Sequence, residues 1–435
     1  FFFFFFFFFF FFFVFFVLFF VFLSFLFSSC IFRHTIITTT TTIMRHLRAA
    51  SSVVALHLWL CIVTSAAEPP LVGTAPNGSL MLQPAAGQDV LVDGVAFQAL
   101  LRRVEAVEQA AAGRQCPVVA STIDVAVLGH TSTYLGGVRA PNGKIYGVPS
   151  NAPSVLIVDP ATNAVDTTSI TGLTGNEKWA GAVLANNGKI YGIPLDAVSV
   201  LIIDPVTNVA DVSRMTGLTG NDKWHDGVLA PNGKIYGIPW GAASVLIIDP
   251  DTNATDTNSI TGLGDGARKW GFGVVAGNGK VYGIPFESSA VLVLDPATNT
   301  ADVTTITGLE DKWAGAVLGR NGKIYGVPSN ASSVLIIDPA TNATDTTTIV
   351  GMDGQLMWHH GVLAGDGKIY CMPFHSDAVL IIDPATDTAD TSAVTGLTGT
   401  SKFAIGVLAH NGKVYGMPFR AAAVLVIQRE RDCTL

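Results

Sequence analysis

The residues best suited to chemistry occur where a repeated pattern in the sequence is broken. Most copies of the pattern have Ala or Gly after an aromatic residue, but one copy has His225-Asp226 and another has His359-His360. Imidazole and carboxylate groups placed together can bind a metal ion or transfer protons. Other unusual residues follow a proline-ended strand of the same repeats: Asp196, Trp240, Glu287, His375, Asp377 and Arg420. Eight of these residues are our ligand-binding candidates: His225, Asp226, Trp240, Glu287, His359, His360, His375 and Arg420.

The common motifs for catalysis and cofactor binding are missing from the sequence. It has no nucleophile elbow, P-loop, dinucleotide-binding glycine motif or pair of cysteines at zinc-ligand spacing. Ser, Cys and His do not occur in a recognisable triad order. We therefore predict no cofactor and no metal, assign no catalytic residue, and favour a protein that is not an enzyme.

The candidate residues lie in a sequence that repeats seven times after residue 115. The motif [Asn/Asp]-Gly-Lys-[Ile/Val]-Tyr recurs with its glycines 45, 45, 46, 43, 45 and 45 residues apart. These glycines are Gly143, Gly188, Gly233, Gly279, Gly322, Gly367 and Gly412. Periods of about 40–50 residues are typical of propellers and solenoid arrays.

One repeat shows why a propeller is favoured over a solenoid. Residues 179–185 are small and apolar, and Asn187-Gly188 is the strongest short signal for a two-residue hairpin turn. Residues 199–203 are wholly apolar, whereas residues 210–215, after an Asp-Pro turn, are polar. Each period thus predicts four antiparallel strands, with the first near a central axis and the fourth facing water. Solenoid coils are shorter and do not need the hairpin.

The two ends of the repeat region predict a closed ring. The last repeat has only three strands, and an unassigned strand, residues 119–128, precedes the first repeat. Alignment places Ser121 where another repeat has Asp166, and Val125 where it has Ile170. We predict an all-β fold, a seven-bladed β-propeller over residues 115–435, whose seventh blade is completed by this N-terminal strand. Closure removes an exposed strand edge.

Two features of the inner strands bear on the candidate site. Glycines recur in them at 137, 181, 227, 273, 315, 361 and 406, three residues into each strand, which indicates close approach of the strands. The third and sixth inner strands should lie nearly opposite each other, which would bring the two His pairs together. Because alternate residues of a strand point to opposite faces, we expect only one residue of each pair to face the axis.

The cysteines agree with ring closure and export. Three remain after the expected signal peptide: Cys116, Cys371 and Cys433. Cys116 precedes the predicted outer strand of the seventh blade and Cys433 follows the strand paired with it, so we predict a disulfide between them. Cys371 replaces a glycine and is expected to be a buried filler.

One repeat, residues 322–342, carries a family resemblance. It reads Gly-Lys-Ile-Tyr-Gly-Val-Pro, followed by Ser-Val-Leu-Ile-Ile-Asp-Pro-Ala-Thr-Asn, and resembles the kelch repeat of β-propellers and the short repeats of secreted bacterial-type propellers. It departs from kelch units in lacking the Gly-Gly pair after the second strand. The aromatic residue also comes at the next inner strand, as at Trp179, instead of soon after the Asp-Pro turn. The resemblance implies the ring but no particular activity.

Charge argues against a nucleic-acid partner. The 435 residues have a net charge of −8, and residues 1–67 contain no Asp or Glu. The rest carries 22 basic and 33 acidic residues, and a body this acidic repels phosphate backbones.

The first 67 residues are expected to be leader sequence. Residues 1–43 begin with an unbroken Phe run, and we interpret them as a mistranslated or low-complexity leader; a membrane anchor is the alternative. Residues 44–67 have the basic start, apolar centre and small cleavage-site residues of a signal peptide. We therefore expect a secreted protein with no membrane span in its mature form. Four glycosylation sequons agree with export: Asn77, Asn253, Asn330 and Asn342.

A linker and a short helix are predicted ahead of the propeller. Residues 68–94 are rich in Pro and Gly, as in extended linkers. Residues 95–114 have apolar positions at alternating spacings of three and four: Phe97, Leu100, Val104, Val107 and Ala111. This helix could form a homo-oligomeric coiled coil through residues 95–112, or lie singly on the propeller.

Three functions remain open at this point. The leading hypothesis is a non-catalytic, secreted propeller that binds a protein or a glycan through its loop face. The first alternative is a propeller lyase or hydrolase, possibly metal-assisted, with His225, Asp226, His359 and His375 at the axis. The second is a structural cell-covering protein. A channel filled by side chains favours the binder, and a deep polar funnel favours the enzyme.

Overall fold

The computed structural model describes residues 116–125 and 133–430 in full, and the backbone of four short strands ahead of them. The chain divides into two compact units, residues 1–115 and 116–435. In the first unit, β1 (Leu71–Thr74) pairs with β2 (Leu80–Gln83), and β3 (Leu91–Val92) pairs with β4 (Val95–Ala96). The predicted leader, signal peptide, Asn77, the helix beyond residue 96 and Cys433 lie outside the described residues. Within the described part no helix is long and apolar enough to cross a membrane.

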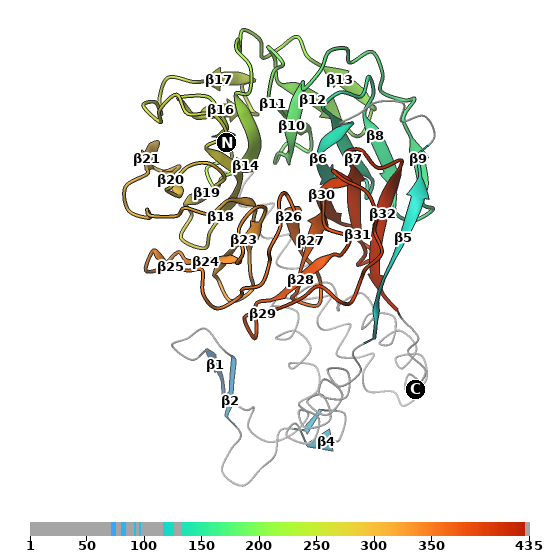
Figure 1. The fold of residues 1–435 in the computed structure, drawn as a ribbon, viewed down its shortest axis with the longest axis vertical. Coiled ribbons are helices and arrows are strands. Elements are labelled where there is room, and N and C mark those ends of the chain that lie inside the picture. The colour runs from blue at the N-terminus through green and yellow to red at the C-terminus, as the bar shows by residue number, and fades with distance from the viewer. Residues whose placement is uncertain are drawn as a thin grey trace, which may run out of the picture. The chain divides into compact units, whose positions relative to one another are not determined.

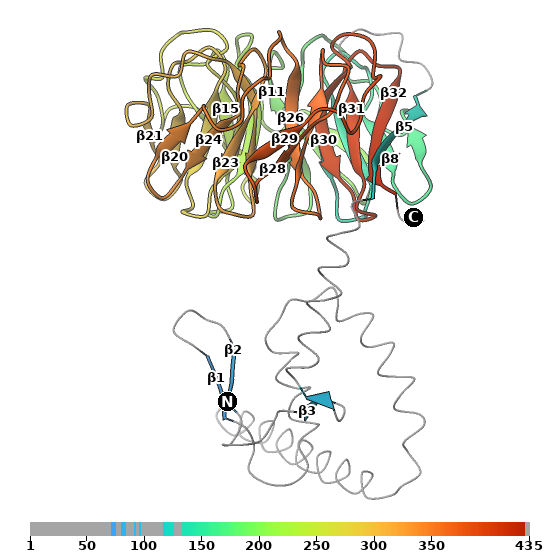
Figure 2. The same cartoon turned by 60° about the horizontal axis from the view of Figure 1, so that its bottom comes forward.

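The second unit is the predicted propeller, a ring of seven four-stranded antiparallel sheets (Figures 1 and 2). Blades 1 and 2 are β6 (Tyr134–Arg139), β7 (Ile145–Pro149), β8 (Leu156–Asp159), β9 (Ala164–Asp166), and β10 (Trp179–Leu184), β11 (Ile190–Pro194), β12 (Leu201–Asp204), β13 (Val209–Asp211). Blades 3 and 4 are β14 (Trp224–Leu229), β15 (Ile235–Pro239), β16 (Leu246–Asp249), β17 (Ala254–Asp256), and β18 (Trp270–Val275), β19 (Val281–Pro285), β20 (Leu292–Asp295), β21 (Thr300–Asp302). Blades 5 and 6 are β22 (Trp313–Leu318), β23 (Ile324–Pro328), β24 (Leu335–Asp338), β25 (Ala343–Asp345), and β26 (Trp358–Leu363), β27 (Ile369–Pro373), β28 (Leu380–Asp383), β29 (Thr388–Asp390).

The seventh blade closes the ring as the sequence predicts. It contains β30 (Phe403–Leu408), β31 (Val414–Pro418), β32 (Ala423–Arg429) and, from the start of the propeller, β5 (Val118–Asp124). Ser121 lies opposite Val426, just as Asp390 lies opposite Ile381 in blade 6, so the predicted register is confirmed. In Figure 1, β5 lies beside β32 although nearly 300 residues of chain lie between Asp124 and Ala423.

Topology gives the ring two different faces. The Asn-Gly hairpins and the Asp-Pro turns both lie on one side, which we call the turn face. The other side, the loop face, carries the connections from the second to the third strand and from the fourth strand to the next blade. Each inner strand therefore begins at the loop face, and it packs against the inner strands of both neighbouring blades.

Close packing between inner strands explains most of the recurring glycines. A Cβ atom on Gly227 would lie 2.5 Å from Cδ1 of Ile193 in the preceding blade. The predicted common position is wrong for two repeats, because Gly181 and Gly315 sit one residue earlier than the others. Ala182 and Ala316 take the usual place there, opposite Gly192 and Gly326. The close-packed position thus accepts Gly or Ala.

On the turn face, a repeated hydrogen-bond pattern ties each blade to the next. In blade 3, Nδ2 of Asn232 donates to the Tyr236 hydroxyl (2.9 Å) and to the carbonyl of Pro296 in blade 4 (3.0 Å). The same Asn-to-Pro contact occurs at six of the seven joints, through Asn142, Asn187, Asn232, Asn278, Asn321 and Asn411. The pattern shows that the shared Asn-Gly-Lys-Ile-Tyr motif is part of the scaffold.

The joint between blades 6 and 7 is the exception. Blade 7 has no Asp-Pro turn, because its third strand and fourth strand come from opposite ends of the propeller. At this joint Asp366 replaces Asn, and its Oδ2 accepts hydrogen bonds from Nε of Arg429 (2.8 Å) and from the Tyr370 hydroxyl (2.8 Å). A charged pair therefore replaces the amide contact where the turn is missing.

Candidate functional site

The two His pairs lie at the loop-face end of the inner strands, β14 and β26. His225 and Asp226 are only 6% and 8% exposed, so both members of the pair are buried. The expectation that only one residue of each pair faces inward rests on strict alternation, and that alternation is interrupted here, because the pairing of β14 with β15 shifts register between Trp224 and Asp226. A β-bulge of this kind re-aims side chains and breaks the strict alternation of a strand. β26 has a similar shift between Trp358 and Gly361.

His225 sits in an aromatic environment at the axis. Its ring stacks on Trp240 (centroids 4.7 Å apart) and meets Phe272 edge-on (5.1 Å). His359, from the opposite side of the ring, is 5.7 Å away, which confirms that the third and sixth inner strands meet across the axis. Burial lowers the pKa of His225 to about 3, so its imidazole is neutral at pH 7.

One nitrogen of His225 is left without a partner. A hydrogen bond with the backbone of Gly271 raises its pKa against the larger effect of burial. Nδ1 is buried and makes no hydrogen bond. In the described part of the chain the other buried side-chain atoms without a partner are Nδ1 of His360 and Oγ of Ser329, on blades 6 and 5. All three atoms belong to residues at the loop-face end of the ring.

Asp226 is a buried carboxylate held by backbone amides. Its Oδ2 accepts a hydrogen bond from the Gly273 amide of the next blade (3.2 Å), and the Gly227 amide also contributes. Desolvation raises the pKa of Asp226 to about 7. None of the ion pairs among the described residues includes it. The carboxylate thus lacks a cationic partner.

The second pair is packed in a similar way. Nδ1 of His359 lies 3.0 Å from the Ala404 carbonyl, and its ring stacks on Phe374 (5.1 Å). His360 packs on Phe272 (5.0 Å). Burial lowers the pKa of His359 to about 4 and that of His360 to about 3. At neutral pH both imidazoles are therefore uncharged, and neither is an imidazolium that could serve as a general acid.

Four aromatic residues that the sequence analysis missed join this cluster. Phe272 lies between the two His pairs, Phe286 packs on Trp240 (5.0 Å), and Phe374 contacts Phe419 (5.4 Å). Phe286, Phe374 and Phe419 each follow the proline that ends the second strand of a blade. That Pro-Phe pair, where other repeats have Pro-Ser or Pro-Leu, is the signal that could have found them. We call the set His225, Trp240, Phe272, Phe286, His359, His360, Phe374, His375 and Phe419 the axial cluster.

The remaining candidates divide between this cluster and the loops around it. His375 stacks on Phe374 (5.3 Å) and its Nε2 lies 3.2 Å from Oγ of Ser401. Glu287 is exposed and pairs with Lys312 (3.2 Å), and Arg420 is exposed. The structure therefore groups His225, Asp226, Trp240, His359, His360 and His375, and leaves Glu287 and Arg420 on the surrounding loops.

Neither a metal centre nor a reactive thiol is visible in the described part of the chain. No group of three or more His, Cys, Asp or Glu side chains there is arranged to hold a metal ion. Cys371 is fully buried opposite Gly361, and desolvation raises the pKa of its thiol. Cys371 is therefore a poor nucleophile, as expected for a filler.

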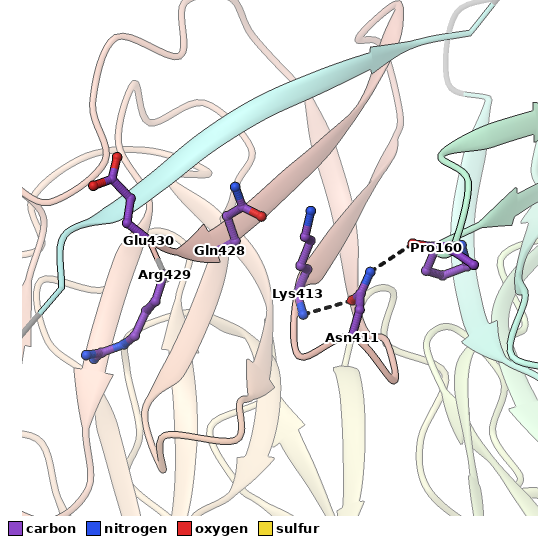
Figure 3. A pocket seen from close by; sticks show the side chains of 7 residues that line it. Pro160, Asn411, Lys413, Gln428, Arg429 and Glu430 are labelled. Atoms are coloured by element: carbon purple, nitrogen blue, oxygen red, sulfur yellow. Dashed lines mark hydrogen bonds between the residues drawn. The ribbon is translucent and has the colours of Figure 1, made fainter. Parts of the chain in front are cut away.

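A separate hollow of about 670 Å³ lies on the turn face beside blade 7 (Figure 3). It is lined by Pro160, Ala161, Asn411, Lys413, Gln428, Arg429 and Glu430. In blades 3, 4 and 6 the corresponding Lys pairs with an Asp at the end of the third strand, as Lys368 does with Asp383 (3.1 Å). In blade 7 that Asp is replaced by Gln428 and the Asp-Pro turn is missing, which leaves the space open. The residues after Glu430 lie outside the described part of the chain.

Comparison with known proteins supports the fold. No family model and no curated protein sequence matches this chain. Solved structures resemble it in shape. The match with a streptogramin B lyase (TM-score 0.59, 9% identity) covers 72% of this chain and 98% of the lyase chain. A virginiamycin B lyase from Staphylococcus aureus (0.58, 9%) covers 72% of this chain and all of its own. The extracellular domain of a putative hybrid two-component system from B. thetaiotaomicron (0.52, 10%) covers 72% of this chain and 42% of its own. At these identities the likeness shows the β-propeller fold alone.

Proposed function

We propose that this protein is a non-catalytic binding module that takes a protein or glycan ligand on its loop face. The observation that supports it is the axial cluster, in which aromatic rings fill the centre of the ring where an enzyme would need an open polar funnel. Trp240, His375 and Phe419 remain partly exposed at the surface of the cluster. Partly exposed aromatic side chains surrounded by polar loops are typical of binding surfaces.

The electrostatics of the axis also favour binding over catalysis. A general acid or base works best with a pKa near the operating pH. The pKa values of His225 and His360 lie far below this range, and both rings are packed against other rings. Asp226 has a suitable pKa, but it is 8% exposed and bound to backbone amides. None of His225, His360 and Asp226 combines access with a suitable pKa.

The test is binding to defined probes by the secreted full chain. Labelled protein would be applied to an array of defined glycans and to an array of synthetic peptides. A ligand lost on Trp240→Ala, but kept on Val206→Ala, supports the proposal, since Val206 is 91% exposed on the turn face. Retention of every ligand by a folded Trp240→Ala protein would contradict it.

Catalysis is tested in a parallel experiment, with a compound named with one of the lyases that share the fold. We expect quinupristin, the compound named with one of those lyases, to be left unchanged by this protein. Consumption of quinupristin that disappears in both His225→Ala and His359→Ala would show an enzyme instead.

We propose in addition that the protein is secreted, with kelch-like repeats, as its signal peptide and repeat motif indicate. Three of the sequons, Asn253, Asn330 and Asn342, lie on turns or loops at the surface, where a glycan could be attached. Cys116 precedes β5, and the Glu430 amide donates to the Pro117 carbonyl (3.1 Å), so the two ends of the blade are adjacent. This adjacency supports the proposed Cys116–Cys433 disulfide. Mass spectrometry of unreduced secreted protein tests the disulfide and the glycans together.

A further inference from the structure

The loop face has a local excess of negative charge beside Trp240. The Gly241 amide donates to the Asp222 carbonyl (2.7 Å), and the Asp222 amide donates to Oδ1 of Asp196 (2.7 Å). Trp240, Asp222 and Asp196 are thus joined in one hydrogen-bonded set of loops. Glu177 is linked to the same set, because its carbonyl accepts from the Asp196 amide (2.9 Å). Three acidic residues therefore lie on loops that are hydrogen-bonded to one another and to the loop that carries Trp240.

The lysines nearby are buried, and their ammonium groups are hydrogen-bonded to backbone carbonyls of the protein. Lys223 lies beneath this set, 4% exposed, and its Nζ donates to the carbonyls of Leu195 (2.7 Å) and Gly220 (2.6 Å). Lys178 is equally buried and donates to the carbonyls of Ser150, Ala152 and Gly175. These ammonium groups bind the loops together and are not presented to a ligand.

The loop face as a whole is acidic at its surface. Eight exposed carboxylates lie on its loops: Glu177, Asp222, Asp265, Glu287, Glu310, Asp311, Asp353 and Asp377. The exposed basic side chains there are Arg214, Arg268 and Arg420, with Lys312 half-buried, and Arg214 is paired with Asp211. A surface of one dominant sign attracts ligands of the opposite sign and speeds their association.

Two buried polar groups near Trp240 lack a hydrogen-bond donor or a cation as partner. His225, stacked on the underside of the indole, has an Nδ1 lone pair with no hydrogen-bond donor. Asp226 is a carboxylate without a cation. Buried polar groups are nearly always paired in native proteins, so the unpaired Nδ1 of His225 beneath a partly exposed ring points to a missing donor. A positively charged N–H group would suit both the acceptors and the ring, because cations bind favourably to the face of an indole.

We propose that the loop face recognises a basic protein segment and that a Lys or Arg side chain of this ligand packs on Trp240. Asp196 and Asp222 flank the charged group, and Asp226 and His225 supply negative potential from below. The inference rests on the proposed binding function and specifies its ligand. A glycan, the other ligand class, becomes an outcome of the test.

The experiment uses calorimetric titration of the secreted full chain with three synthetic peptides of equal length. Their residues alternate Arg with Ser, Gln with Ser, or Glu with Ser. We expect only the Arg peptide to bind, with an affinity that falls as salt is raised. Trp240→Leu, which keeps an apolar side chain but loses the aromatic face, should weaken binding about tenfold.

Two further variants separate recognition from folding. Asp226→Asn removes a buried charge without changing shape, so it should weaken peptide binding several-fold while the denaturation midpoint stays the same or rises. Asp251→Asn is the matched control, because Asp251 is an exposed carboxylate on the turn face, and it should leave binding unchanged.

The outcomes distinguish this inference from the proposed function. Equal binding of the Gln peptide and the Arg peptide, or a folded Trp240→Leu protein with unchanged affinity for the Arg peptide, overturns the basic-segment proposal. If the arrays instead reveal a neutral glycan whose binding needs Trp240, the loop face is a binding site but its ligand class is not the one proposed here. If no ligand of any class depends on Trp240, both proposals fail.

Discussion

The two faces of the ring are built from the same repeats but differ in regularity. On the turn face, the Asn side chain of one blade binds the Asp-Pro turn of the next at six of seven joints, with distances between 2.9 and 3.1 Å. At the axial end of the loop face the equivalent residue is Leu135, Ala180, His225, Gly271, Ala314, His359 or Ala404. The turn face is nearly seven-fold symmetric, and the loop face is not.

This contrast separates structural residues from candidate functional ones within a single chain. A residue that recurs in every blade has a structural role that every blade needs, such as contact with the neighbouring blade. A residue found in only one or two blades is not needed for the fold that all blades share. In the described part of the chain, the buried side-chain polar atoms without a hydrogen-bond partner all lie at the loop-face end of the ring. The four experiments below challenge this distinction, in order of decreasing effect.

Crowding at the loop-face end of the ring gives the largest expected effect. A Cβ atom on Gly136 would lie 2.2 Å from the backbone oxygen of Ala180, so Gly136→Ala requires the backbone to move. We expect a loss of about 3 kcal/mol of unfolding free energy, measured by urea denaturation. Gly277→Ala is the control on the turn face, where nothing lies within 4 Å of the added atom. Equal stability of the two variants would show that the inner strands are less tightly packed than described.

The axial cluster should make stability depend on pH. At pH 5 the unfolded chain protonates His225, His359 and His360, whereas the folded chain keeps them neutral, because burial lowers their pKa values to about 3, 4 and 3. Asp226, with its pKa raised to about 7, opposes this by holding one proton in the folded state. The unfolded state binds more protons overall, so stability rises with pH between 5 and 6, by roughly 1–3 kcal/mol per pH unit.

Urea midpoints across this pH range measure the slope. The double variant His225→Phe/His359→Phe should flatten it, since two of the three groups that take up protons on unfolding are gone. A slope that persists in the double variant would place its origin outside the axial cluster.

Breaking one joint on the turn face should have a smaller, local effect. Asn232→Ala removes the contacts to the Tyr236 hydroxyl and to the Pro296 carbonyl, and we expect a loss of about 1–2 kcal/mol. Asn221→Ala, at an exposed position of the loop face, should change stability little. If ligand binding falls in Asn232→Ala without a loss of stability, the turn face has a function beyond holding the blades together.

The smallest effect is expected where the charged pair replaces the amide contact. Asp366→Asn restores the residue found in the other blades but removes the ion pair with Arg429, whose side chain is 31% exposed. Because partly exposed ion pairs contribute little, the loss should stay below about 1 kcal/mol. Thermal denaturation of Asp366→Asn, Arg429→Met and the double variant measures the coupling. A gain in stability for Asp366→Asn would mean that the amide is preferred even without the turn.

Most of the fold could be predicted because its determinants are local and repeated. The Asn187-Gly188 hairpin and the Asp-Pro turn set the strand order of a blade, and the seven copies set the number of blades. The missing fourth strand of the last copy then identified residues 119–128 as the closing strand, which in the structure is Val118–Asp124. The same blade count placed His225 opposite His359.

The parts of the site that escaped prediction depend on contacts between blades. The bulge after Trp224 turns both His225 and Asp226 toward buried surroundings, and nothing in the local sequence signals it. Phe272 occupies a position that is glycine in three other blades, and its role depends on rings from blades 3 and 6. Lys223 received no role in the sequence analysis, yet carbonyls from separate loops bind its buried ammonium group.

The closing strand also determines on which face of the ring the preceding chain is attached. β5 begins opposite Arg429, at the turn-face end of blade 7, and runs toward the loop face. Whatever precedes residue 116 is therefore attached on the side away from Trp240. If the loop face binds a ligand as we propose, a tag fused ahead of residue 116 is joined at the opposite face of the ring, and ligand binding by the immobilised protein can be measured there.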